Sequence, residues 1–151
     1  VTAYTAGHAP IEPAVGYRID YRERSVVISG DSVVTSETRR IANKVDLLMH
    51  DALSVPLTET AAKAAAKAGL TRAAKIISDV TDYHASTESL IELGADTEPG
   101  MVALYHLVPA PENLIMSKIF ERNLPENFVL ANDGDWFELP SNSAEIIYTG
   151  N

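Results

Sequence analysis

Short apolar runs alternate with helical segments along this chain, and that alternation restricts it to a layered α/β architecture. Residues 17–23 alternate between apolar and polar with a period of two, which is typical of a half-buried strand. Residues 25–29 form an apolar, β-branched run that is typical of a more buried strand. Thr35 or Ser36 can then cap a helix over residues 36–44. We therefore expect a mixed sheet flanked by helices.

The remaining segments continue this alternation. Thr58 is expected to cap a helix that stops at Gly69, and Ser86 to cap one that ends near Gly94. A tight turn at residues 23–24 is expected between the strand that begins at residue 17 and the strand over residues 25–29. Further strands are expected over residues 1–5, 45–50, 101–109, 127–131, 135–140 and 145–149, and further helices over residues 57–68, 71–78 and 113–122.

The charge balance and the cysteine count limit the partners of the chain. A net charge of −9 over 151 residues speaks against nucleic-acid binding by this segment as a whole, although it is compatible with a local basic groove. With no cysteine, the chain has neither a thiolate metal site nor a cysteine nucleophile, so any metal must be held by His, Asp or Glu. No apolar run approaches the length that spans a bilayer.

The length corresponds to one domain or to a piece of a larger one. The chain begins at Val1 without a methionine, within a strand-like segment, and reads like a chain entered in the middle. No targeting signal is visible in it. A bacterial cytoplasmic or periplasmic location is therefore left open.

Histidines and one aspartate fall at the ends of the predicted elements. His8, His50 and His106 follow or end strand-like runs, His84 precedes a helix start, and Asp31 follows the run that ends at residue 29. Ligands of open α/β sheets gather at the carboxyl ends of strands, because side chains there point out of the packed layers. Imidazole and carboxylate groups without thiolates suit a catalytic zinc or another transition metal.

Each of these residues also has a purely structural interpretation. His8 fits an exposed loop histidine, and Asp31 after a glycine fits a turn residue equally well. His50 is more readily a buried histidine bonded to a backbone carbonyl than a metal ligand. His84 fits an accessory to a helix cap, and His106 fits an ordinary core histidine. Only the occurrence of all of them together favours a metal site.

Four segments in order carry a family resemblance. They are "GHAPIEPAVGYRIDYRERSVVISGDS", "DLLMHDA", "DYHASTES" and "ALYHLVP". Together they resemble the C-terminal half of a metallo-β-lactamase-fold hydrolase, in the branch similar to ribonuclease Z and to arylsulfatase-type metallohydrolases. The resemblance implies a four-layer αββα sandwich of two similar halves, of which residues 1–151 would form the second as a single half-domain. The HxHxDH motif of the N-terminal half, which supplies most metal ligands in the family, is absent from these residues.

The resemblance also implies a role for individual residues. His8 matches a histidine that binds the first metal, and His106 matches a histidine that binds the second. Asp31, in "SGD", matches the aspartate that bridges the two metals. His84, in the segment that opens a helix, matches a histidine that helps to protonate the leaving group.

The chain departs from the family pattern at several positions. "HDA", with His50 and Asp51, stands where the family often has "HEA", and both side chains are expected to support the site from behind the ligands. Ser32 stands where threonine is usual. "YHLVP" replaces the "HFS" and aromatic pattern of true ribonuclease Z, which weakens the case for tRNA processing.

The resemblance implies a metal-dependent hydrolase that attacks a phosphodiester, a sulfate ester or another ester with an activated water. The complete enzyme would hold two zinc ions, or manganese or iron in their place. Because His8, Asp31 and His106 are too few for two metals, we expect weak metal binding and little or no hydrolysis from this chain alone. The alternatives are a non-catalytic oligomerising or binding domain that keeps the fold, and an acidic α/β protein with unrelated structural histidines.

The expected partners follow from the same resemblance. They are a small-molecule or ester substrate and the missing N-terminal half. Half of a sandwich also exposes the sheet face that normally packs on its twin, so we expect a homodimer or a trapped fragment.

Overall fold

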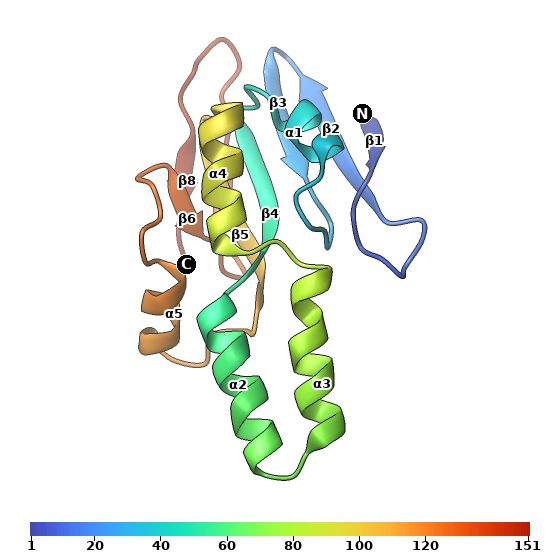
Figure 1. Cartoon of the computed structure of the whole chain (residues 1–151). Coiled ribbons are helices and arrows are strands. Elements are labelled where there is room, and N and C mark those ends of the chain that lie inside the picture. Colours follow the sequence, from blue (N-terminus) through green and yellow to red (C-terminus); the bar gives the residue numbers. More distant parts are fainter.

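A six-stranded mixed sheet lies at the centre of the computed structural model, which describes residues 1–151 (Figure 1). Its strands are adjacent in chain order: β1 (Thr2–Thr5), β2 (Val15–Tyr21), β3 (Arg24–Ile28), β4 (Leu47–Leu53), β5 (Met101–Val108) and β6 (Phe128–Leu130). The first three pair antiparallel, and β3 to β6 pair parallel. A separate antiparallel pair follows, β7 (Trp136–Glu138) with β8 (Ile147–Thr149). The predicted mixed sheet is confirmed.

Five α-helices and a short 3₁₀ turn connect the strands. They are α1 (Ser36–Ala42), α2 (Val55–Lys67), α3 (Thr71–Asp79), η1 (Val80–Asp82), α4 (Thr87–Thr97) and α5 (Leu114–Phe120). Figure 1 shows α1 and α4 against one face of the sheet, whereas α2 and α3 form a hairpin that extends away from it. None of the helices is both long and apolar enough to cross a membrane.

The main core lies between the parallel strands and α4. Leu48 on β4 and Val102 and Leu104 on β5 are fully buried, and Leu90 and Leu93 of α4 belong to the same cluster. Because side chains alternate across a strand, these positions turn one face of the sheet towards the helices. That packing fixes the parallel strands whose ends carry the candidate site.

Apolar side chains remain exposed on the other face of the sheet. The Arg18 guanidinium donates to the backbone carbonyl of Ile41 in α1, which places Arg18 on the helix-covered face. Its neighbour Tyr17, and Tyr21 four residues further on, therefore lie on the opposite face, and both are exposed. The homodimer expected from such a surface stays a prediction.

The start of α2 differs from the predicted one. Thr58 does not cap the helix; α2 begins at Val55 with Ser54 in the cap position, and Pro56 stands in its first turn. A proline in the first turn is itself a start signal, because its missing N–H would have no partner there anyway. Thr58 lies one turn inside the helix and is buried.

Several further boundaries are shifted. Strand β4 covers Leu47–Leu53 rather than residues 45–50, so His50 and Asp51 lie within the strand and not at its end. The turn between β2 and β3 is formed by Arg22 and Glu23, one residue earlier than predicted, and both have positive φ, as a two-residue hairpin turn requires. Helix α4 continues through Gly94 to Thr97. A Cβ at Gly94 would lie 2.9 Å from Cζ of Phe128, so this glycine provides close packing rather than a helix end.

Candidate metal centre

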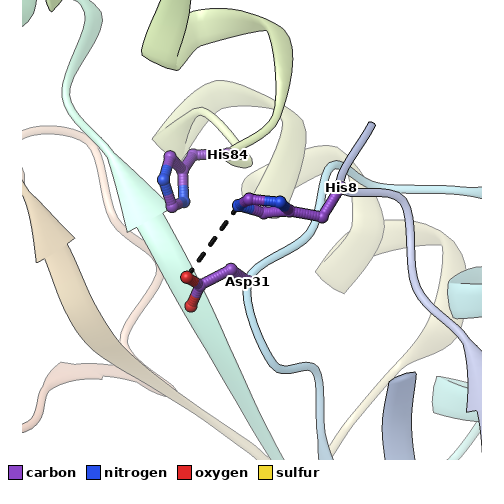
Figure 2. Close-up of side chains that lie close together, drawn as sticks. All are labelled: His8, Asp31 and His84. Atoms are coloured by element: carbon purple, nitrogen blue, oxygen red, sulfur yellow. Dashed lines mark ion pairs between the residues drawn. The ribbon is translucent and has the colours of Figure 1, made fainter. Parts of the chain in front are cut away.

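Three segments that are distant in the sequence bring His8, Asp31 and His84 together (Figure 2). His8 lies in the loop after β1, Asp31 follows β3, and His84 lies between η1 and α4. One ligand atom from each residue lies within 4.8 Å of the other two. The cluster is thus assembled at the carboxyl end of β3, at the edge where ligands of such sheets gather.

His106 approaches the cluster through the carboxylate of Asp31. Nε2 of His106 lies 3.4 Å from Oδ2 of Asp31, and Nε2 of His8 lies 3.9 Å from the same oxygen. The ring centroids of His106 and His84 are 5.4 Å apart. One carboxylate oxygen therefore faces two imidazoles that are distant from each other in the sequence.

A bulge in β5 directs His106 to this position. Asp51 pairs with Tyr105 and Ala52 with Leu107, so His106 is the extra residue between two paired positions. Its φ of 43° lies in the left-handed region. Such bulges bend a strand and re-aim a side chain, which explains why His106 is half exposed at the rim rather than part of the core.

Gly30 turns the chain out of β3 immediately before Asp31. Its φ is +64°, and a Cβ there would lie 2.9 Å from the backbone carbonyl oxygen of Val15. Any other residue would be strained and crowded at this position. The glycine of "SGDS" therefore sets the direction in which the Asp31 side chain leaves the sheet.

Ser32 ties the His8 loop to the turn after β3. The Gly7 N–H donates to Ser32 Oγ over 2.9 Å, and Gly7 also forms an antiparallel bridge with Val33. Ser32 is fully buried. The Ser32 hydroxyl thus holds two of the site segments in register.

Asp51 lies behind His84 rather than within the cluster. Its Oδ2 accepts a hydrogen bond from Nδ1 of His84 over 2.7 Å, and its Oδ1 accepts one from the Ser32 N–H over 3.1 Å. Asp51 is 0% exposed and His84 is 7% exposed, so little water competes for these bonds. With Nδ1 engaged in this way, Nε2 is the nitrogen of His84 that remains for a ligand or substrate.

His50 does not reach the cluster. It is fully buried, and its Nδ1 lies 2.9 Å from the backbone carbonyl of Asp51 and 2.9 Å from Oδ1 of the same residue. Its Nε2 has no hydrogen-bond partner. His50 therefore contacts the site only through Asp51, and its carbonyl contact matches the structural interpretation of this residue.

Two tyrosines that the sequence analysis did not single out, Tyr83 and Tyr105, lie near the cluster. The ring of Tyr83 lies 4.9 Å from that of His8 and 5.1 Å from that of His84. Burial raises the pKa of Tyr105, and the negative charges of Asp51 and Asp31 act in the same direction. For Tyr83, the only signal in the sequence was its position next to His84 in "DYHASTES".

The donor set fits a transition metal. Imidazole nitrogens and a carboxylate oxygen are the ligands that catalytic zinc takes, and one zinc ion uses about three protein ligands and keeps a position open. His8, Asp31 and His84 offer ligand atoms within 4.8 Å of one another, and Nε2 of His106 lies 3.4 Å from Oδ2 of Asp31. These four residues are therefore the candidate ligands for such an ion.

Comparison with known sequences places the chain beside one named group of proteins. It is 28% identical over 103 residues to ribonuclease Z of Mycobacterium avium and 29% identical over 102 residues to ribonuclease Z of Mycolicibacterium gilvum. Each alignment covers 68% of this chain but only 33% and 32% of the relative. The chain thus spans about a third of the length of the curated relatives it matches. No family model matches it.

Comparison with solved structures addresses the fold. The metallo-beta-lactamase fold protein YhfI from Bacillus subtilis superposes with a TM-score of 0.59 at 15% identity. The match covers 88% of this chain and 47% of that chain. The predicted architecture is confirmed by this likeness, which at such low identity concerns the fold alone.

Proposed function

We propose that this chain, which resembles ribonuclease Z in sequence and has the architecture of part of a metallo-β-lactamase fold, supplies one side of the active site of a metal-dependent hydrolase. The observation that carries the proposal is the convergence of His8 and His106 on one oxygen of Asp31. Imidazole nitrogens and a carboxylate oxygen are the ligand types that a catalytic zinc ion takes. A shared cation is the simplest occupant of that arrangement.

In this proposal, His8, Asp31 and His106 are protein ligands of two metal ions. The two ions would be zinc, or manganese or iron in its place. When bound, such ions lower the pKa of water and neutralise charge that develops on the oxygens of an ester. The remaining ligands come from an N-terminal half with the HxHxDH motif. The half-exposed side chains of Asp31 and His106 leave room for them.

His84 is proposed to move the proton of the reaction. Asp51 accepts from Nδ1 of His84, which fixes the tautomer and aims Nε2 of the ring at the cluster. Because Nδ1 keeps its own hydrogen in that bond, the proton donor would be the imidazolium of His84: Nε2 would give its proton to the leaving oxygen of the substrate, and the neutral ring would remain bonded to Asp51. The Ser32 N–H and the Asp51 carboxylate hold that geometry without contact with the reacting atoms.

The proposed substrates are esters of phosphate, sulfate or carboxylic acids. The name ribonuclease Z of the relatives favours a phosphodiester among the three. An inactive binding domain is the second candidate, because the ligand set is incomplete and apolar side chains such as Tyr17 and Tyr21 are exposed on the sheet.

Metal titration is the first test. We expect the isolated chain to bind at most one zinc ion, with a Kd of about 1 μM or weaker, because the three expected ligands fall short of a closed site. Isothermal titration calorimetry measures this, with Asp31→Asn expected to abolish the heat and Asp96→Asn, on the exposed face of α4, as the matched control. Tight uptake of two zinc ions by the isolated chain would contradict the expected division of ligands.

Turnover separates the two candidate functions. We expect metal-dependent hydrolysis of bis(p-nitrophenyl) phosphate when the chain is mixed with an N-terminal half that carries HxHxDH, and little or none from either part alone. His84→Gln should suppress turnover in the mixture without weakening zinc binding, since His84 acts on the proton. A mixture that forms a stable complex and binds two metals, yet hydrolyses none of the three ester types, identifies a binding domain instead.

A further inference from the structure

A surface groove lies between α5 and the edge strand β6, and it shares no residue with the candidate centre. Its volume is about 610 Å³. One wall consists of Leu114, Ser117 and Glu121, whose spacing of three and four residues places them on one face of α5 and its C-cap. Strand β6 forms another wall. Figure 1 shows α5, β6 and β8 together at one edge of the molecule. We name this feature the α5 groove.

The lining of the α5 groove is largely apolar. Leu124 and Leu130 line it and pack against the core from their half-buried positions. Leu114, in the first turn of α5, is 82% exposed, and Ile115 beside it is 74% exposed. Asn113 caps this turn by accepting from two of its backbone N–H groups, so both side chains are presented by an ordered helix. Adjoining exposed apolar side chains of this kind mark an interaction surface.

Every charged side chain that lines the α5 groove is acidic. Glu121 and Glu126 belong to the lining, and no lysine or arginine does. Glu121 pairs with Lys118, whereas Glu126 is in no ion pair. Residues 123–151, which include β6 and β8, contain five carboxylate side chains and no lysine, arginine or histidine. The groove therefore combines an apolar lining with a negative potential.

We propose that the α5 groove binds a basic amphipathic segment of a partner protein. Apolar side chains of that segment lie against Leu114 and Leu130, and its lysines or arginines face Glu121 and Glu126. A helix that docks in a groove inserts its apolar side chains and leaves its polar face at the rim, so such a segment matches both properties of the groove. The opposite charges steer the encounter and fix its orientation. The inference goes beyond the proposed hydrolase function and does not depend on it.

The same features disfavour other occupants of the α5 groove. Nucleic acids and anionic lipid surfaces carry negative charge and are repelled by the carboxylates of the groove. A second copy of the chain carries a net charge of −9 as well, which opposes self-association. A small ligand within the groove would leave Ile115 exposed, since this residue lies outside the lining. An elongated basic segment can cover both the groove and the first turn of α5.

Peptide titration tests this proposal. The full chain is titrated into a fluorescein-labelled peptide of leucine and lysine whose leucines recur every three to four residues, and fluorescence anisotropy is recorded. The same peptide with glutamate in place of lysine tests the role of charge. Amide NMR spectra of the chain locate the contact.

The apolar wall is tested by Leu114→Ala. We expect this variant to weaken binding of the leucine–lysine peptide by about tenfold, because the buried contact of one leucine is lost. Leu70→Ala is the control and should keep the affinity, since Leu70 is also an exposed leucine but lies in the turn between α2 and α3. Circular dichroism checks that both variants keep the fold.

The charges are tested by E121Q/E126Q. We expect this variant to weaken binding by about threefold to tenfold at low salt and to reduce the salt dependence of the affinity. The control E88Q/E92Q removes two exposed carboxylates from α4, with the same change in net charge, and should keep the affinity. The glutamate peptide should not bind, and the amide signals that shift should be those of α5 and β6.

Three results would overturn the proposal. The first is the absence of saturable binding of the leucine–lysine peptide below about 1 mM. The second is an equal loss in the groove variants and in their controls, which would show that the peptide follows net charge or scattered apolar side chains. The third is self-association that Leu114→Ala abolishes, with no peptide binding, which analytical ultracentrifugation detects and which would make a second copy the occupant.

Discussion

Asp51→Ala is expected to lower the free energy of unfolding by about 3–5 kcal/mol, because it removes a buried carboxylate that accepts hydrogen bonds from its partners. Asp51 is 0% exposed and accepts from Nδ1 of His84 and from the Ser32 N–H. Truncation leaves both donors buried without an acceptor, and each then costs its own desolvation penalty. Urea unfolding followed by circular dichroism measures the change.

Asp51→Asn is the matched control for this prediction. Asparagine keeps the shape and one acceptor oxygen but loses the charge, so its cost should be about 1–3 kcal/mol, less than that of Asp51→Ala. A change of the midpoint at constant m-value would assign the effect to stability. If alanine costs less than asparagine, Asp51 does not hold His84 and Ser32 in the way described.

Phe120→Ala is expected to cost about 3–5 kcal/mol through the cavity that it leaves. Phe120 is the single buried residue of α5 and is 0% exposed, in the same core cluster as Leu104. Its loss removes the anchor of α5, so amide hydrogen exchange should rise in α5 before it rises elsewhere. Urea unfolding gives the global change.

Leu114→Ala is the control on the same helix. Leu114 is 82% exposed, so its truncation should change stability by no more than about 0.5 kcal/mol. An equal cost at both positions would show that helix propensity, rather than burial of Phe120, determines the stability of α5.

The order of strands and helices was predictable from periodicity, whereas several boundaries were not. Alternating and β-branched runs predicted β2 and β3, and Ser86 caps α4 as expected by accepting from the Ser89 N–H. The start of α2 was misplaced because Thr58 is a good cap by type, while Ser54 and Pro56 provide the start in the structure. Residue type alone cannot rank two candidate caps when packing of the first turn decides between them.

The candidate site was predictable as a set of residues but not as a geometry. The sequence order singled out His8, Asp31 and His84, which the structure places within reach of one another. The bulge that turns His106 outward has no local sequence signal, because it is set by pairing between β4 and β5. The hydrogen bond between Asp51 and His84 likewise depends on how two distant segments pack.

The insertion of the hairpin between β4 and β5 also has a consequence for the order of folding. Strands β1 to β3 form a local antiparallel meander, joined by the loop of residues 6–14 and by the turn at Arg22 and Glu23, so His8 and Asp31 can meet through pairing that is close in sequence. Leu48 must pair with Val102 across the whole helical insertion, which carries a large loop-closure cost. His106 therefore reaches Asp31 only once this long-range pairing has formed.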